Sequence, residues 1–141
     1  MIRFPVTRAI GVDVTSISRF KKLLEKNNDF VERLSLRLLH PKYELNKFVT
    51  LRKNHESDQL LLFLAGTWAS KEALYKSLDI SDQRSFEFKH WYRSYDENGK
   101  PLIQSDIHTT DEFLLSLSHD QDTVVANVIR QQYITIPDIT K

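Results

Sequence analysis

The stretch Leu61 to Leu78 reads LLFLAGTWASKEALYKSL and carries the strongest helical pattern of the chain. At about 100° per residue, apolar side chains line one face of this helix. That face comprises Leu61, Leu64, Ala65, Trp68 and Tyr75. Glu72 lies in the middle of this face, where an unpaired carboxylate is costly to bury. Lys76 follows one turn later, so either a local i,i+4 ion pair or a functional site explains the two charges.

The composition fits a single domain, 1–141, with one hydrophobic core. Hydrophobic residues make up 40% and charged residues 28%, which argues against extensive disorder. The net charge of +1 predicts no global attraction to nucleic acid or to a membrane, and no apolar run is long enough to span a bilayer. The absence of cysteine excludes disulfides, thiolate catalysis and cysteine-ligated zinc.

Helical signals dominate the first half, after a short strand expected at residues 8–15. Ser18 suits the N-cap of a helix that runs to about residue 27. Asp29 and Glu32 form a start signal for a second helix, which runs towards residue 39. Pro41 interrupts that helix and can occupy the first turn of a third.

Strand signals dominate the second half. The aromatic-rich residues 86–95 are expected to form a strand, and Asn98-Gly99 is the strongest hairpin turn signal in the chain. The return strand is expected at residues 101–104, and two further strands at 113–118 and 123–130. The tail, 131–141, is expected to be irregular. This order predicts an α+β fold, with helices mainly in the first half packed on an antiparallel sheet.

Asp13 is a second acid in an unexpected place, between two valines of the first strand. It could cap the following helix or accept hydrogen bonds from Ser16 and Ser18. If it lies near Glu72, the pair offers the hard oxygen ligands that Mg²⁺ takes together with phosphates and waters. Glu44 is a third candidate acid.

Two other features have both a structural and a functional interpretation. Ser118 and His119 end an apolar strand at the rim of a loop, where a side chain is either a turn residue or a ligand contact. Arg19, Lys22 and Lys26 form a basic stripe, which is either a solvated helix face or a docking surface for an acidic partner.

Three segments occur in a characteristic order. They are Ile10-Gly11-Val12-Asp13-Val14 with Arg19-Phe20, Trp68-Ala69-Ser70-Lys71-Glu72-Ala73 with Lys76, and Leu115-Ser116-Leu117-Ser118-His119. Together they resemble the 4'-phosphopantetheinyl transferases, and the short single-domain branch, holo-acyl-carrier-protein synthase, fits best. The turn Asn98-Gly99-Lys100-Pro101 resembles a further family feature, a Gly-x-Pro turn near the nucleotide.

The resemblance implies a 4'-phosphopantetheinyl transferase-like fold and a Mg²⁺-dependent reaction. The phosphopantetheine arm of coenzyme A moves to a serine of an apo acyl carrier protein, and 3',5'-ADP is released. By this resemblance Asp13 and Glu72 hold the metal and are catalytic together with Lys76. The implied coenzyme A contacts are Lys71, Lys76, Lys100, Pro101, Ser118 and His119. The implied carrier-docking residues are Arg19, Lys22 and Lys26, and the implied assembly is a homotrimer.

The base that accepts the serine proton is left open among Glu72, Glu44 and a metal-bound water. The chain also departs from the family pattern. Thr67 stands where many relatives have arginine, so one phosphate contact is missing or supplied elsewhere. The segment 40–44 and the glycine-free segment 79–85 look less like the common bacterial form. They favour a fungal-type member in the mitochondrial matrix, with a cytoplasmic location as the alternative.

Two other functions compete with the transferase. The first is a non-catalytic protein- or RNA-binding α+β module, in which Asp13 and Glu72 are structural and residues 86–95 contact the partner. It predicts no Mg²⁺-dependent affinity for coenzyme A. Strand alternation divides the basic and aromatic side chains of 86–95 between two faces, so nucleic acid is not an expected partner. The second is a metal-dependent phosphohydrolase.

Overall fold

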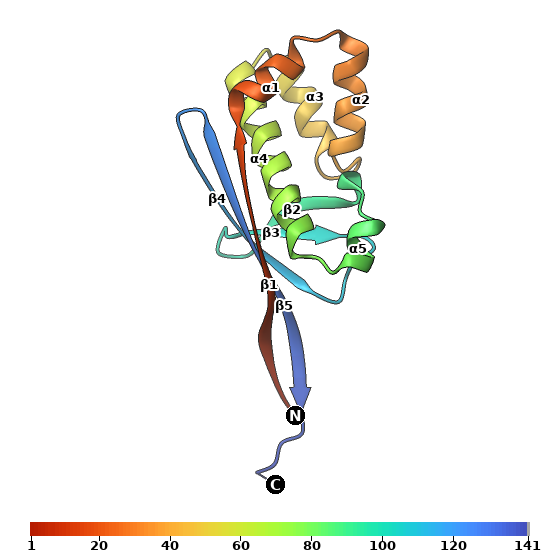
Figure 1. Ribbon diagram of the computed structural model, residues 1–141, viewed down its shortest axis with the longest axis vertical. Coiled ribbons are helices and arrows are strands. Elements are labelled where there is room, and N and C mark those ends of the chain that lie inside the picture. Colours follow the sequence, from red (N-terminus) through yellow and green to blue (C-terminus); the bar gives the residue numbers. More distant parts are fainter. Residues whose placement is uncertain (141) are drawn as a thin grey trace.

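The computed structural model describes residues 1–140, in which helices cover one face of an antiparallel sheet (Figure 1). The helices are α1 (Ile17–Leu24), α2 (Asn28–Leu38), α3 (Leu45–Lys53), α4 (Ser57–Ser77) and α5 (Ile80–Arg84), followed by a 3₁₀ turn (Phe88–His90). The strands are β1 (Ile2–Ser16), β2 (Trp91–Tyr95), β3 (Pro101–Ser105), β4 (Glu112–Asp120) and β5 (Thr123–Ile136). Their spatial order is β1-β5-β4-β3-β2. The predicted α+β class is confirmed.

Helix α4 is the centre of the core. It packs on β1 and β5 with one side and on α1 and α3 with the other. For this reason Leu64, Ala69 and Leu74, which point in different directions around the helix, are all fully buried. The single apolar face predicted from the sequence is therefore too narrow, and one of its members, Tyr75, is exposed. None of the helices within residues 1–140 has the length and apolar character needed to cross a membrane.

Strand β1 approaches α4 most closely at Gly11. A Cβ atom at this position would lie 1.9 Å from the carbonyl oxygen of Ala73, so any larger residue would push the strand away from the helix. Gly11, Asp13 and Thr15 share one face of the strand because side chains alternate along it. The close approach at Gly11 therefore carries Asp13 to the surface of α4.

The helix starts differ from those predicted. Helix α1 begins at Ile17, and the Ser18 hydroxyl and backbone N–H both donate to Asp122. The cap of α2 is Asn27, whose side chain accepts a hydrogen bond from the backbone N–H of Phe30. The third helix does not begin at Pro41, because residues 41–44 form turns and helical geometry starts only at Leu45.

Strands β1 and β5 are longer than predicted. β1 and β5 pair antiparallel from Ile2 opposite Ile136 onward and form a ribbon that projects below the helices in Figure 1. The prediction of an irregular tail is wrong for residues 131–136, and Lys141 lies outside the described residues. The predicted hairpin is confirmed, with Gly99 at a φ of 76°, whereas residues 88–90 form the 3₁₀ turn instead of a strand.

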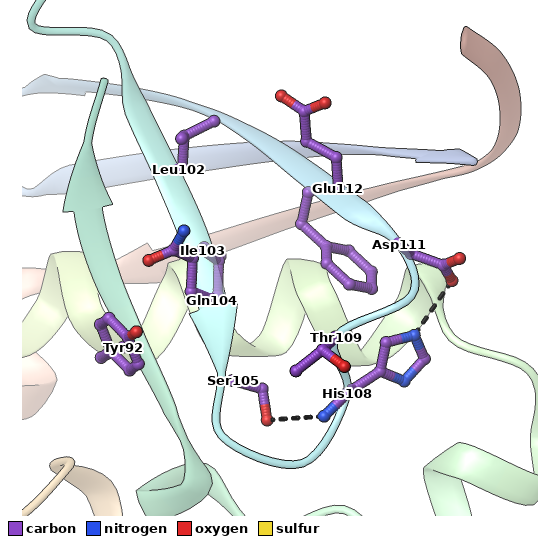
Figure 2. A pocket seen from close by; sticks show the side chains of 10 residues that line it. Tyr92, Leu102, Ile103, Gln104, Ser105, His108, Thr109, Asp111 and Glu112 are labelled. Atoms are coloured by element: carbon purple, nitrogen blue, oxygen red, sulfur yellow. Dashed lines mark hydrogen bonds and ion pairs between the residues drawn. The ribbon is translucent and has the colours of Figure 1, made fainter. Parts of the chain in front are cut away.

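A polar cluster fastens the loop between β3 and β4 (Figure 2). The Oδ2 atom of Asp111 lies 3.0 Å from His108 Nε2 and accepts a 2.6 Å hydrogen bond from Arg130 Nε. Arg130 also pairs with Asp79 at the end of α4, with 3.2 Å between Nη1 and Oδ1. Burial acts to raise the pKa of Asp111, but the hydrogen bonds from its neighbours outweigh burial and lower it.

Candidate active site

Asp13 of β1 and Glu72 of α4 lie close enough to influence each other's charge. The pKa of Glu72 is raised, first because the side chain is partly buried and next because the carboxylate of Asp13 is near. Lys76 joins the two elements: its Nζ lies 3.1 Å from Asp13 Oδ1 and donates to the Val12 carbonyl oxygen at 2.9 Å. The two acids thus converge on one place, as the transferase hypothesis requires.

The purely structural explanations of these charges do not hold. Lys76 reaches across to the strand, and among residues 1–140 it forms no ion pair with Glu72. Ser16 and Ser18 donate to Asp122 at 2.8 Å each, so Asp13 is not their acceptor. Those hydrogen bonds lower the pKa of Asp122. Asp13 is thus paired with Lys76, whereas Glu72 forms no ion pair within residues 1–140 and is near the charges of Lys76 and Arg19.

Trp68, one turn before Glu72, connects the acids to a basic side chain and borders a cavity. The Arg19 guanidinium lies 4.9 Å from the ring centroid of Trp68, and its charge acts to lower the pKa of Glu72. The cavity has a volume of about 460 Å³ and is lined by Phe30, Arg33, Leu34, Arg37, Leu38, Trp68 and Phe88. Neither Asp13 nor Glu72 is part of this lining.

The donor set suits Mg²⁺ in the presence of a phosphate ligand. Within the described part of the chain, no three or more His, Cys, Asp and Glu side chains gather into a group that could hold a metal. Mg²⁺ is usually held by one or two carboxylates, with substrate phosphates and waters completing its shell. Asp13 and Glu72 meet this lower requirement. Their mutual repulsion is also relieved by a divalent cation.

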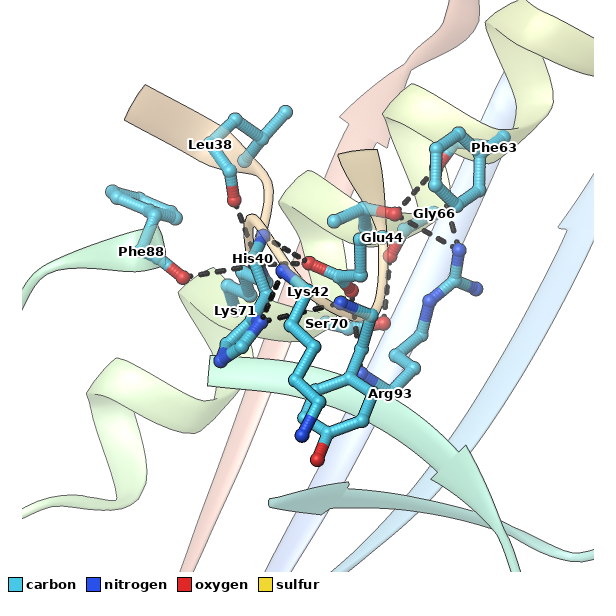
Figure 3. Close-up of polar contacts among 12 residues, drawn as sticks. Leu38, His40, Lys42, Glu44, Phe63, Gly66, Ser70, Lys71, Phe88 and Arg93 are labelled. Atoms are coloured by element: carbon cyan, nitrogen blue, oxygen red, sulfur yellow. Dashed lines mark hydrogen bonds and ion pairs between the residues drawn. The ribbon is translucent and has the colours of Figure 1, made fainter. Parts of the chain in front are cut away.

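Lys71 does not contribute to this site, which corrects the prediction that it contacts coenzyme A (Figure 3). Its side chain is fully buried, and its Nζ donates to Glu44 Oε1, to the Leu38 carbonyl at 2.7 Å and to the Phe88 carbonyl at 3.0 Å. Burial lowers the pKa of Lys71 to about 8, against the opposing effect of Glu44. With its donors used inside the core, Lys71 has a structural role.

Glu44 is likewise removed from the candidates for the base. It is buried, and its Oε1 accepts hydrogen bonds from Lys71 and from the backbone N–H of His40 at 2.9 Å. Its Oε2 accepts from the backbone N–H of Arg93 at 3.3 Å. A carboxylate held in this way by buried donors is not free to take a proton from a substrate.

The remaining predicted contacts lie away from the acids of the same chain. Lys100 and Pro101 begin β3, three strands from β1, which corresponds to roughly 14 Å at the usual strand spacing. Ser118 lies opposite Val125, which lies opposite Val14, so Ser118 shares the face that points away from Asp13. His119 is exposed at the end of β4, two strands from β1. Their roles stay predictions.

The basic stripe is exposed, but only part of it is helical. Arg19 and Lys22 lie on α1, which ends at Leu24, and Lys26 follows the helix. Its Nζ lies 4.4 Å from the ring centroid of Phe30 at the start of α2. The stripe therefore runs from α1 towards the cavity beside Trp68, next to the acids.

Arg93 of β2 is a residue that the sequence did not single out. Its Nη2 donates to Thr67 Oγ1 at 2.9 Å. In the sequence Arg93 is one of several basic residues in an aromatic strip, and only the fold shows which of them enters the core.

Comparison with known proteins identifies the family. The profile of the 4'-phosphopantetheinyl transferase superfamily matches residues 9–135. The chain belongs to this superfamily. A holo-[acyl-carrier-protein] synthase of Geobacillus kaustophilus is 34% identical over 120 residues, which cover 85% of both chains. One from Mycoplasma mobile is 34% identical over 126 residues, covering 89% of this transferase and 91% of the relative.

Solved structures agree in fold. A holo-(acyl-carrier-protein) synthase from Bacillus anthracis, in complex with CoA (3',5'-ADP), superposes with a TM-score of 0.68 at 25% identity, covering 89% of this chain and 97% of the other. The Plasmodium yoelii acyl carrier protein synthase with ADP bound gives a TM-score of 0.71 at 24% identity, covering 92% and 98%. At 24% identity, the similarity to the Plasmodium yoelii structure supports the fold and nothing further.

Proposed function

We propose that this transferase is a holo-[acyl-carrier-protein] synthase, which moves the 4'-phosphopantetheine arm of coenzyme A to a serine of an apo acyl carrier protein. The observation that carries the proposal is the proximity of the carboxylates of Asp13 and Glu72, within a chain of this superfamily. A binding module gives no reason for two repelling carboxylates to share one partly buried place.

The reaction is a substitution at the β-phosphorus of coenzyme A. The serine oxygen forms a bond to phosphorus, the bond from phosphorus to the 3',5'-ADP oxygen breaks, and the serine proton passes to a base. With Glu44 buried and hydrogen-bonded, Glu72 and a metal-bound water remain as the candidates for this base. Lys76 neutralises negative charge at the departing phosphate.

We further propose that the enzyme uses Mg²⁺, held by Asp13 and Glu72. When bound, the ion supplies Lewis-acid stabilisation of the diphosphate charge. The chain's own part is to orient the two carboxylates: Gly11 sets the distance between β1 and α4, and Lys76 ties Asp13 to the helix.

The acidic carrier protein is expected to dock on Arg19, Lys22 and Lys26. These exposed cations lie beside the cavity, so they orient the partner and raise its association rate. Reversing all three charges should raise the KM for the carrier at least about tenfold, a loss of roughly 1.4 kcal/mol. The KM for coenzyme A should stay unchanged, and a parallel rise in both would contradict this docking surface.

We also propose a homotrimer. Ile10, Val12 and Val14 lie on the sheet face opposite α4 and are 68%, 49% and 64% exposed, which is unusual for three neighbouring apolar side chains. Analytical ultracentrifugation tests the assembly: Val12→Lys should yield monomers, and a wild-type protein that sediments as a monomer would refute it.

The location in the mitochondrial matrix remains a proposal, supported by the unusual segments 40–44 and 79–85. Cell fractionation with an antibody to the protein tests it, and a purely cytoplasmic signal would favour the alternative.

The direct test of the function is a mass measurement. The protein is incubated with Mg²⁺, coenzyme A and an apo acyl carrier protein, and the carrier should gain the mass of one phosphopantetheine arm. A carrier protein whose serine is replaced by alanine is the control. An unchanged mass of the native carrier, with the enzyme folded, would exclude the transferase function.

A further inference from the structure

Helix α1 begins directly after strand β1, with no loop between them. The strand ends at Ser16 and the helix starts at Ile17, so the backbone changes from extended to helical within one residue. Ser16 is the N-cap residue, but its side chain makes no capping hydrogen bond to the helix, and the first turn holds no acidic residue. The helix therefore lacks the local groups that usually accept from its first backbone N–H groups and favour the positive end of its dipole.

The turn between β4 and β5 supplies the missing acceptors. Asp122 accepts hydrogen bonds from the Ser18 backbone N–H at 2.7 Å and from the Ser16 and Ser18 hydroxyls at 2.8 Å each. Its backbone carbonyl accepts from the Ile17 backbone N–H at 2.8 Å. Asp122 lies 104 positions after Ser18 in the sequence, so a distant hairpin caps this helix and places a negative charge at its N-terminus.

The capped junction lies between two parts of the proposed site. Helix α1 carries Arg19 and Lys22, two of the cations proposed to bind the carrier, and β1 carries Asp13, three residues before the strand ends. Because no loop separates the two elements, the angle at their junction sets the position of the cations relative to the carboxylates. The middle of α1 is held by Phe20, which is buried in the core, whereas its start is held by the hydrogen bonds to Asp122.

We infer that Asp122 is a positioning residue for the transfer reaction. It fixes the start of α1, so that a carrier protein bound to Arg19 and Lys22 presents its serine to the site at Asp13 and Glu72. The inference rests on the proposed function. Asp122 acts through the residues of the junction, to which all of its hydrogen bonds described above are made.

The test compares the two substrates in the variant Asp122→Ala. The KM for the carrier should rise at least about fivefold and the KM for coenzyme A should stay unchanged, because only the carrier is expected to contact α1. Electrostatics alone predicts the opposite result, since the loss of a negative charge beside the basic helix should favour an acidic partner. Asp122→Asn keeps a side-chain oxygen that can accept from the Ser18 backbone N–H, so it should restore most of the wild-type KM.

Asp120→Ala is the matched control. Asp120 is an exposed acid of the same hairpin, and within residues 1–140 its side chain forms no hydrogen bond. Its replacement removes the same charge and should not raise the KM for the carrier. A rise as large as that of Asp122→Ala, or an equal rise of both KM values in Asp122→Ala, would overturn the assignment of Asp122.

The junction and the carrier affinity can also be measured without turnover. Amide hydrogen exchange at Ser18 should be at least about tenfold faster in Asp122→Ala, with the rate at Val128 in the core unchanged. Calorimetry with the acyl carrier protein should then show weaker binding, and unchanged binding would refute the positioning role. If Asp122→Ala does not fold, Asp122→Asn should show both effects on a smaller scale. A wild-type protein that transfers no arm, yet binds the carrier in an Asp122-dependent way, would refute the proposed function and leave this role of Asp122 standing.

Discussion

Lys71 and Glu72 are neighbours in the sequence, yet they belong to two regions of opposite character. Lys71 points into the core, where Glu44 and two carbonyl oxygens take its donors. Glu72 points to another side of α4, where the like charge of Asp13 is near. The donors of Lys71 are all satisfied within the protein, whereas the neighbouring carboxylates of Asp13 and Glu72 are available to bind a cation.

The difference shows how a structural charge is distinguished from a functional one. A buried ion pair with additional hydrogen bonds is complete without any further partner. Two carboxylates held together at a surface repel each other, and a bound cation relieves this cost. The same helix supports both, because successive residues are turned by about 100° around its axis.

The largest effect is expected from a variant that disrupts the buried ion pair of Lys71 and Glu44. Lys71→Met leaves Glu44 buried without its cation, so the free energy of unfolding should fall by about 3–5 kcal/mol. Denaturant titration measures it, and the double variant Lys71→Met/Glu44→Gln should recover part of the loss. A stable Lys71→Met protein with a raised KM for coenzyme A would show instead that Lys71 contacts the substrate.

The next largest effect concerns the carboxylate pair, Asp13 and Glu72. Glu72→Gln should lower kcat by roughly 100- to 1000-fold, the range seen when one electrostatic contact to a transition state is lost. The fold should be retained, because Glu72 has no buried donor that depends on it. Steady-state kinetics and circular dichroism on one preparation measure both quantities, and near-normal turnover would show that Glu72 is not catalytic.

The pH dependence of stability should separate Glu72 from Asp111, whose buried Oδ2 atom contacts His108 and Arg130. The lowered pKa of Asp111 stabilises the fold above about pH 4 and this contribution is lost on acidification. Asp111→Asn should therefore cost about 1–3 kcal/mol at pH 7 and progressively less at lower pH.

Glu72 should behave in the opposite way in the metal-free protein. Its raised pKa means that ionisation destabilises the fold as the pH rises through that value. Glu72→Gln should then be neutral below pH 4 and slightly stabilising, by less than about 1 kcal/mol, at pH 7. Thermal unfolding from pH 3 to pH 8 measures the stability of Asp111→Asn and Glu72→Gln. A change in stability of the same sign for both variants at pH 7 would contradict the opposite roles assigned to the two acids.

Local patterns predicted much of this molecule. The Asn98-Gly99 turn signal predicted the hairpin of β2 and β3, and the spacing of apolar residues predicted α4. Asp13 and Glu72 could be selected because each is an acid in an apolar setting, a signal that needs no knowledge of the partner. The extension of β1 and β5 could not be predicted, since it depends on pairing between the two ends of the chain.

The structural role of Lys71 could not be predicted from the sequence either. A lysine beside a glutamate gives no indication of which side of the helix other elements will cover. In this fold, strands cover one side of α4 and helices cover the other. Arg93 presents the same difficulty, because the sequence does not show that its guanidinium reaches Thr67 of α4.

The most direct test of the account is the Mg²⁺ dependence of transfer in the wild-type protein and in two variants, Asp13→Asn and Glu72→Gln. If the two carboxylates hold one ion, each variant should raise the Mg²⁺ concentration for half-maximal rate at least about tenfold. A variant that loses activity but keeps the wild-type Mg²⁺ dependence would contradict a shared metal site.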